Sequence, residues 1–142
     1  MTINKKDIEV SYNCHMAAIR KNNPLNVYLV ILCKDLPVYT VHQNSTQKQK
    51  EKNRLECIRY VLNFLRNFSR SKLHKFDLYY LLTLEMTPAG GRGLHLNILL
   101  HIPNVVIGRY LQEKLYKMFD TNEEEWINMK MKPFFLKGAK DF

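Results

Sequence analysis

Residues 85–103 constrain the fold more than any other stretch, because a glycine-rich turn joins two strand-like patterns there. Before the turn, residues 76–86 alternate between two sets of side chains. After it, residues 94–102 carry an aliphatic side chain at every second position. Residues two apart in a strand share one face. The pattern therefore predicts a hairpin with one aliphatic face, which we expect to pack against helices.

The aliphatic alternation also predicts the register of this hairpin. Pairing Met86 with Leu94 places the aliphatic residues of both strands on one face, and a slip of one residue would misplace one strand's set. In that register Glu85 lies directly across from His95. Opposed side chains have Cβ atoms about 5 Å apart, so this carboxylate and this imidazole can share one metal ion.

Asn97 extends the polar face by one position and gives the group an oxygen–nitrogen–oxygen donor set. Mg²⁺ and Mn²⁺ accept such ligands, and the lack of a thiolate argues against structural zinc. We therefore predict a Mg²⁺ or Mn²⁺ site at Glu85, His95 and Asn97. The alternative is an ordinary cross-strand His–Glu pair beside a polar asparagine. His101 is roughly 20 Å further along the strand, so we expect it to serve in surface or edge packing.

The chain has 142 residues, which favours a single domain with its own core. Its 22 Lys and Arg outnumber 13 Asp and Glu, giving a net charge of +9. Such an excess is typical of a domain that binds a polyanion, with nucleic acid as the leading candidate. The alternative is that the charge only aids solubility.

Three widely spaced cysteines, Cys14, Cys33 and Cys57, lack metal-ligand spacing and are expected to be free thiols in a reducing compartment. The polar N-terminus shows no signal peptide, and no apolar run is long enough to span a bilayer. We therefore expect an intracellular, cytoplasmic protein.

The remaining periodicities predict an α+β fold, with a sheet that has helices on one face. The expected helices cover residues 7–22, 45–71 and 105–119, and the expected strands cover 26–33, 76–86, 94–102 and 126–132. Within the second helix we expect this apolar stripe: Leu55, Ile58, Val61, Leu62, Leu65 and Phe68. Its many Lys and Arg residues form either a solvated face or a contact surface for phosphate.

The strand that ends in Glu85, the Gly-containing turn, the His95–Leu96–Asn97 run and the following LLHIP segment resemble the HUH endonuclease superfamily. The resemblance is greatest to the rolling-circle replication initiators of plasmids and phages. It implies a ferredoxin-like fold whose central antiparallel sheet carries the metal ligands. It also implies nicking of single-stranded DNA by a tyrosine that becomes joined to the 5′ phosphate.

On this resemblance His95 and Asn97 match the two ligand positions around Leu96, and Glu85 matches the third. The family usually has His where this chain has Asn97, although related viral initiators use an amide there. The family's nucleophile commonly stands in a Tyr-x-x-Lys motif on a later helix. Tyr110 is the candidate, but the lysine that follows it comes one residue too late. The alternatives are that Tyr110 is a packing residue and that the nucleophile lies beyond Phe142, the chain then being an N-terminal fragment.

The resemblance further implies single-stranded DNA as substrate, held by basic side chains and by an aromatic that stacks on bases. The predicted contact residues are Arg92, Tyr79, Lys130 and Lys132. A helicase or other replication machinery is the implied protein partner. Two other functions stay open: a catalytically silent module that binds single-stranded nucleic acid, and a small protein whose basic surface meets an acidic partner. The aromatic–Gly–aromatic signature of RNA-recognition folds is missing, which argues against the module.

Overall fold

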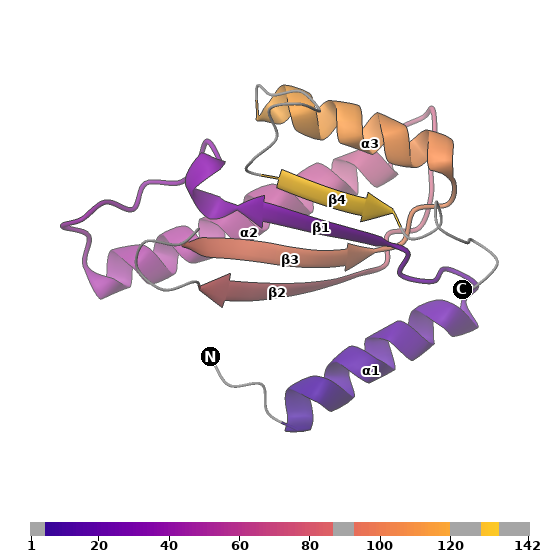
Figure 1. The fold of residues 1–142 in the computed structure, drawn as a ribbon, viewed down its shortest axis with the longest axis horizontal. Coiled ribbons are helices and arrows are strands. Elements are labelled where there is room, and N and C mark those ends of the chain that lie inside the picture. The colour runs from indigo at the N-terminus through magenta and orange to yellow at the C-terminus, as the bar shows by residue number, and fades with distance from the viewer. Residues whose placement is uncertain (1–4, 87–92, 120–128, 134–142) are drawn as a thin grey trace.

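The computed structural model of the protein describes residues 5–86, 93–119 and 129–133. The elements in chain order are α1 (Lys5–Arg20), β1 (Val27–Leu32), the short 3-10 helix η1 (Cys33–Asp35), α2 (Gln47–Ser69), β2 (Tyr80–Met86), β3 (Leu94–Leu100), α3 (Val105–Met118) and β4 (Met129–Pro133) (Figure 1). The strands form one antiparallel sheet in the order β2-β3-β1-β4. Together with the order β1-α2-β2-β3-α3-β4, this is the ferredoxin-like arrangement, so the predicted fold class is confirmed.

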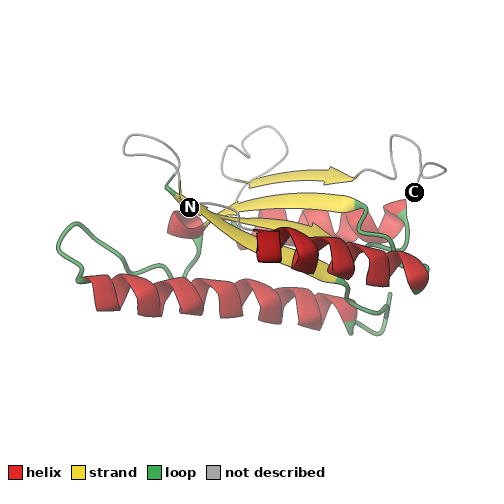
Figure 2. Ribbon diagram, turned by 90° about the horizontal axis from the view of Figure 1, so that it is seen from below, coloured by secondary structure: helices red, strands yellow, loops and turns green. Residues whose placement is uncertain are grey.

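The core lies between the sheet and the two helices α2 and α3. Figure 2 shows α2 as a layer below the sheet. Val61 and Leu65 from α2 and Leu111 and Leu115 from α3 join the inner side chains of β1 and β3 in one buried cluster. Helix α1 contacts β2 and lies beside that edge strand, away from α2 and α3 (Figure 1). The sheet face opposite the core is therefore not covered by α2 or α3.

Helix α2 begins with a capping box. The Thr46 backbone N–H donates to Gln49 Oε1 at 2.8 Å, and the Gln49 N–H donates to Thr46 Oγ1 at 3.2 Å. The predicted apolar stripe was wrong at Leu55, which is 53 % exposed. Two residues along a helix turn the side chain by roughly 200°, so Leu55 points away from the core that contains Cys57.

Asn53 occupies an inner position that the apolar pattern could not reveal. It is buried, its Nδ2 donates to the Val38 carbonyl at 2.7 Å, and its Oδ1 accepts from the Thr40 N–H at 3.2 Å. Both backbone groups belong to the loop that leads into α2. The amide therefore holds this loop on the helix by satisfying backbone groups that have no ladder partner.

The hairpin pairs in the predicted register, with Met86 opposite Leu94 and Glu85 opposite His95. Leu96 and Ile98 on β3 are fully buried against the helices, as expected. Strand β2 is shorter than predicted, because it begins at Tyr80 rather than at residue 76. The preceding Phe76 instead packs edge-on against Phe68 at the end of α2, with ring centroids 6.1 Å apart. The predicted strand residues 126–128 lie outside the described residues.

Two further expectations are met within the described residues. None of the described helices is long and apolar enough to cross a bilayer. Cys33 and Cys57 are free and buried. A hydrogen bond to Cys57 and burial together hold the pKa of the Cys33 thiol well above its usual range. The side chain of Cys14 lies outside the described part of the chain.

Candidate metal centre

Glu85 and His95 meet at the turn end of the hairpin. His95 Nε2 lies 3.1 Å from Glu85 Oε2. The two side chains differ in exposure: that of His95 is 9 % exposed and that of Glu85 is 61 % exposed. Glu85 lies near the end of an edge strand, which leaves its carboxylate open to solvent. The pair thus joins a sheltered nitrogen ligand to an accessible oxygen ligand.

Asn97 links this pair to a tyrosine from a different part of the chain. Its Nδ2 donates to Glu85 Oε2 at 2.9 Å, and its Oδ1 accepts from the Tyr28 hydroxyl at 2.9 Å. Tyr28 lies on β1, two residues before Val30, the register partner of Asn97. A chain of hydrogen bonds therefore crosses β1, β3 and β2. We call Tyr28, Glu85, His95 and Asn97 the polar cluster.

The cluster keeps its carboxylate ionised. The hydrogen bond from Asn97, followed by the hydrogen bond and charge of His95, lowers the pKa of Glu85 below its ordinary value. Each of these contacts favours the charged form of the carboxylate. Glu85 is therefore an anion at neutral pH, as a metal ligand must be.

Both ring nitrogens of His95 face acceptors. Nδ1 lies 3.2 Å from the Gly93 carbonyl oxygen, and Nε2 faces Glu85. A neutral imidazole has one N–H and can donate to only one of them. The hydrogen bond to Glu85 needs the proton on Nε2, whereas a metal bound at Nε2 would require it on Nδ1, where it would donate to the Gly93 carbonyl. Metal-binding histidines commonly have this arrangement, with the second ring N–H held by a backbone carbonyl.

The spacing of one pair of donor atoms also suits a hard divalent cation. Neighbouring ligands of an octahedral Mg²⁺ lie roughly 3 Å apart, because each metal–ligand bond is about 2.1 Å. His95 Nε2 and Glu85 Oε2 are 3.1 Å apart, whereas the 2.9 Å contact of Asn97 with Glu85 is made by the amide nitrogen Nδ2, which is not a metal ligand. For Asn97 to offer its oxygen, its amide must be turned end for end, which would place Nδ2 beside the Tyr28 hydroxyl. With that rotamer an amide oxygen would stand beside the Glu85 carboxylate in place of Nδ2.

The amide is essential to this fit. Nowhere in the described ranges do three or more His, Cys, Asp or Glu side chains gather in a way that could hold a metal. Glu85 and His95 supply two such ligands. A metal bound here with a third protein ligand from the cluster would have to take it from Asn97.

Tyr110, the predicted nucleophile, does not join the cluster. Its ring stacks on His74, with centroids 6.1 Å apart and an interplanar angle of 22°. The next residue, Leu111, is fully buried in the core that α3 shares with the inner sheet face. Tyr110 is thus on the helix side of the sheet, and Glu85 is on the other side. Helix packing directs Tyr110 toward His74 and away from the cluster, and its role as the nucleophile stays a prediction.

The prediction that His101 lies apart from the metal ligands is confirmed, but its surface role was wrong. His101 is 7 % exposed, and its Nδ1 lies 2.9 Å from the Pro24 carbonyl oxygen. Burial lowers the pKa of His101, partly opposed by the bond to Pro24. The His101 N–H donates to the Tyr79 carbonyl at 2.9 Å. Tyr79 therefore lies at the opposite end of the hairpin from the cluster.

The structure describes the backbone of two of the three basic residues predicted to contact DNA, Lys130 and Lys132. Lys132 is the register partner of Tyr28, and Lys130 is that of Val30, so β4 runs beside the strand that supplies the tyrosine. The side chains of both lysines lie outside the described residues, as does Arg92 altogether.

Tyr28 is the cluster residue that sequence reasoning missed. It stands inside the apolar run of residues 26–33, where it resembles one more buried strand residue. Its alternation with the fully buried Val27 and Leu29 is the one available signal that it faces away from the core. Only the pairing of β1 with β3 shows that its hydroxyl reaches Asn97.

Comparison of the chain with protein-family models, with curated proteins and with solved structures finds no match. The function proposed below therefore depends on the polar cluster, the sheet that carries it and the basic charge of the chain.

Proposed function

We propose that the protein is a metal-dependent, sequence-specific endonuclease of the HUH type. It nicks single-stranded DNA to start rolling-circle replication or transfer of a plasmid or phage. The observation that carries this proposal is the convergence of Glu85, His95 and Asn97 on the outer face of a ferredoxin-like sheet. The net charge of +9 supports a polyanionic substrate.

The three ligands would hold Mg²⁺ or Mn²⁺. Such an ion polarises a phosphate and stabilises charge on its oxygens. Glu85 contributes a carboxylate that is ionised and open to solvent. The Gly93 carbonyl orients the His95 ring so that Nε2 faces Glu85. Hydrogen bonds already bring Glu85 and His95 together, and Asn97 would join them once its amide has turned.

Tyr28 is our proposed nucleophile in place of Tyr110. Its hydroxyl donates a hydrogen bond to Asn97 Oδ1, and Tyr28 lies on the same sheet face as the three proposed ligands. In the proposed step the phenol oxygen attacks phosphorus and loses its proton to water. The bond from phosphorus to the 3′ oxygen breaks, and that oxygen takes a proton from water. The products are a 5′ phosphotyrosine and a free 3′ hydroxyl. The alternative is a tyrosine beyond Phe142.

The proposal is tested by covalent capture. The protein is mixed with Mn²⁺ and a pool of labelled single-stranded oligonucleotides of random sequence, then separated under denaturing conditions. We expect label on the wild-type protein and on Tyr110→Phe, and none on Tyr28→Phe or Glu85→Gln. Thr83→Ala is the matched control, because Thr83 is exposed on β2 opposite Asn97 and makes no bond within the cluster. Capture by Tyr28→Phe would exclude Tyr28 as nucleophile, and no capture by any protein would contradict the activity.

A second candidate is the silent module that binds single-stranded nucleic acid. It is favoured by the polar cluster itself, because Tyr28, Asn97 and Glu85 satisfy one another without a metal. Thermal unfolding separates the two candidates. A metal site predicts that millimolar Mn²⁺ raises the Tm of the wild type and not that of His95→Ala. Oligonucleotide binding with neither this shift nor covalent capture would identify the silent module.

The proposed activity also implies the surroundings of the protein. It would act in the cytoplasm, where plasmid and phage DNA is replicated, with a helicase or other replication machinery as its partner.

A further inference from the structure

The outer surface of α2 carries a line of cations that the polar cluster does not use. We propose that this line docks along the phosphate backbone of double-stranded DNA. We call it the basic stripe: Lys48, Lys52, Arg59, Arg66 and Arg70.

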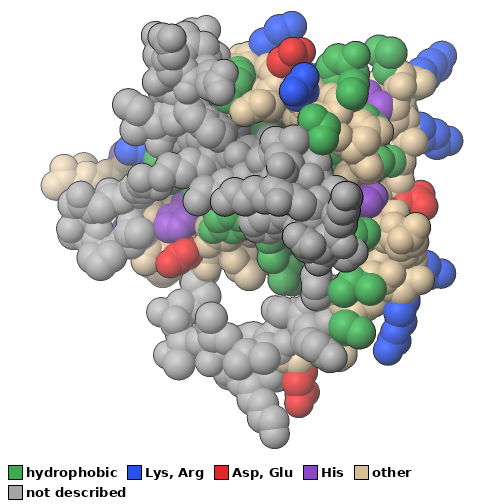
Figure 3. All heavy atoms as spheres, turned by 45° about the vertical axis from the view of Figure 1, so that its right-hand side comes forward, with side chains coloured by type: hydrophobic (Ala, Val, Ile, Leu, Met, Phe, Trp, Pro, Cys, Tyr) green, Lys and Arg blue, Asp and Glu red, His purple; other side chains and the backbone are tan. Residues whose placement is uncertain are grey.

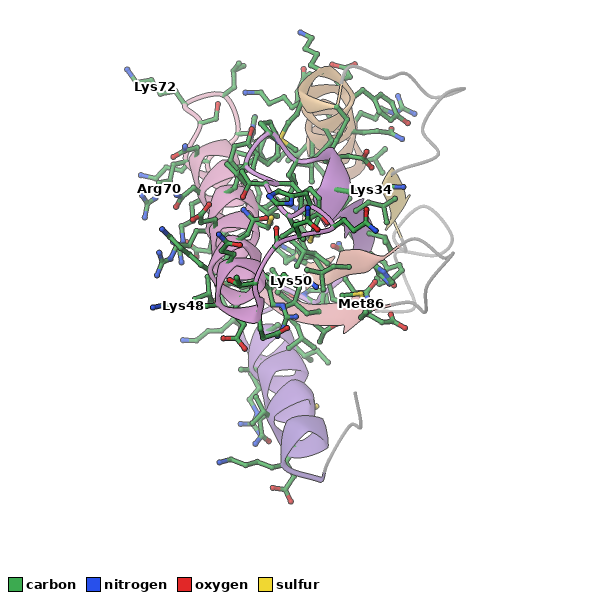
Figure 4. The ribbon with its side chains drawn as sticks, turned by 90° about the vertical axis from the view of Figure 1, so that its left-hand side faces the viewer. Lys34, Lys48, Lys50, Arg70, Lys72 and Met86 are labelled. Atoms are coloured by element: carbon green, nitrogen blue, oxygen red, sulfur yellow. The ribbon has the colours of Figure 1, made fainter. Side chains whose placement is uncertain are left out.

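The stripe is straight and exposed. Its successive members are 4, 7, 7 and 4 residues apart, which keeps all five within an arc of roughly 40° on an α-helix. With a rise of 1.5 Å per residue the stripe is about 33 Å long. Each member is exposed, and the opposite side of α2 is buried at Cys57, Val61 and Leu65. Figure 4 shows Lys48 and Arg70 pointing away from the sheet near the two ends of the helix.

No described acidic side chain forms an ion pair with a member of the stripe, and the exposed Glu51 lies between Lys48 and Lys52 on the helix. The ion pair found among the described residues is the one between His95 and Glu85, on the other side of the sheet. Glu56, which lies closest to the middle of the stripe, is turned inward, where its Oε2 accepts from Asn53 Nδ2 at 3.3 Å. Five cations are therefore available to an external anion.

The side chains between these cations favour a duplex over other polyanions. Proteins that hold single strands add aromatic side chains on which bases stack, whereas Tyr60 and Phe64 on α2 face inward, packed against the core. Helices that lie on membranes add a broad apolar face, and the stripe is interrupted by one exposed apolar residue, Leu55. A stripe of charge without stacking or apolar partners suits the duplex backbone, whose dense negative charge attracts cations whatever the base sequence.

The length of the stripe agrees with this partner. About 33 Å corresponds to nearly one helical turn of duplex DNA, roughly 34 Å. Since α2 covers the inner sheet face, the stripe and the polar cluster lie on opposite sides of the sheet. The duplex beside a nicking site and the single strand to be cut would therefore contact different surfaces. The choice of DNA rests on the proposed function, but the docking itself needs neither a metal nor a tyrosine.

Other exposed cations provide a matched control. On the face shown in Figure 3, Lys and Arg side chains stand along the upper and right-hand edges. A control variant replaces by Gln the same number of exposed cations elsewhere: Arg20, Lys21, Arg109, Lys114 and Lys117. Both variants lose the same net charge, so they differ only in where the charge is removed.

The test is the salt dependence of duplex binding, measured by fluorescence anisotropy with EDTA present. The probe is a duplex of about 30 base pairs, titrated between about 50 and 200 mM salt. Five phosphate contacts predict a contribution of about −4.5 to the slope of log K against log salt. We expect the stripe variant to lose most of this slope and about 100-fold in affinity at low salt. The control variant should keep it, and Arg59→Gln alone should lower the slope by about 1.

Several outcomes would overturn the proposal. Equal losses in the stripe and control variants would show diffuse attraction without a docking surface. A loss confined to single-stranded DNA, to phosphatidylserine vesicles or to an RNA duplex would assign the stripe to that partner. Circular dichroism and Tm establish that each variant is folded. If the fivefold variant does not fold, the single Arg59→Gln variant decides, and an unchanged salt slope in it would contradict the proposal. If Tyr28→Phe and Glu85→Gln bind duplex DNA but no protein nicks single-stranded DNA, the docking proposal is supported and only the proposed nuclease activity is contradicted.

Discussion

The two histidines of the hairpin lie at opposite ends of the same strand segment and have the same exposure, 7 % for each residue. The two ring nitrogens of His95 face the ionised Glu85 carboxylate and the Gly93 carbonyl oxygen. Among the described residues, the ring of His101 has one hydrogen-bond partner, the Pro24 carbonyl oxygen, which faces Nδ1. Burial therefore does not distinguish the proposed metal ligand from the other histidine, whereas the partners of the two rings differ.

The end of the sheet that contains His101 is closed by hydrogen bonds between a buried side-chain amide and the backbone. Asn26 Nδ2 donates to the Ile102 carbonyl at 2.8 Å, and the Ile102 N–H donates to Asn26 Oδ1 at 2.9 Å. This buried amide continues the ladder of β1 and β3 past the last paired residues. The end that contains His95 is held by side chains around an exposed carboxylate. We infer that one end of the hairpin contributes stability and that the other is free for chemistry.

The largest effect that would test this comparison is expected at Glu85. Replacing Glu85 by Gln keeps the shape of the side chain but removes the charge of the proposed metal ligand. We expect covalent capture of DNA to fall about 10²–10³-fold, while the Tm without metal stays within error of wild type, because the carboxylate is exposed. A large loss of Tm with normal capture would reverse the roles assigned to the two ends.

Asn26→Ala should show the opposite behaviour. It removes two hydrogen bonds and leaves the buried N–H and carbonyl of Ile102 without partners. We expect the free energy of unfolding in urea to fall by about 2–4 kcal/mol, with the Mn²⁺-induced rise in Tm retained. Asn67→Ala, at an exposed position of α2, is the control and should be close to wild type. A lost Mn²⁺ response in folded Asn26→Ala would show that the two ends are coupled.

A smaller effect is expected in the pH dependence of stability. Burial lowers the pKa of His101 in the folded protein below its ordinary value near 6.5. Protonation is therefore easier in the unfolded chain, and stability is complete above that ordinary value and declines as pH falls through the lowered folded pKa. His101→Asn can still donate to Pro24 but does not titrate. Urea unfolding at several pH values should show a weaker acid-side decline in this variant, and an unchanged decline would rule out His101 as its source.

The smallest effect concerns the acid titration of Glu85. The folded pKa is lowered, so the contribution of Glu85 to stability is present above its ordinary pKa near 4.5 and is lost as pH falls through the folded value. The Asn97 bond is the largest cause. Asn97→Ala should therefore raise the pKa of Glu85, as followed by NMR of its side-chain carboxyl carbon, more than Thr83→Ala does. No difference between the two variants would mean that the bond is not formed in solution.

Much of the candidate site could be predicted from the hairpin pattern. Met86 and Leu94 had to share the aliphatic face, and this alone put Glu85 opposite His95 and Thr83 opposite Asn97. The prediction held because a strand repeats every two residues and one face had to be buried. Helix faces were harder to predict, since a helical stripe admits neighbours such as Leu55, and buried polar residues such as Asn53 do not fit an apolar pattern.

The sequence by itself determined the α+β class, the register of the hairpin and the meeting of Glu85 with His95, because these depend on local periodicity. Tertiary structure alone decided three other matters. It inserted β1 between β3 and β4, which brought Tyr28 to Asn97 across 69 residues of chain. It buried His101 against Pro24, and it placed Tyr110 on the helix side of the sheet. Such contacts arise from how separate elements pack, and no spacing within a single element encodes them.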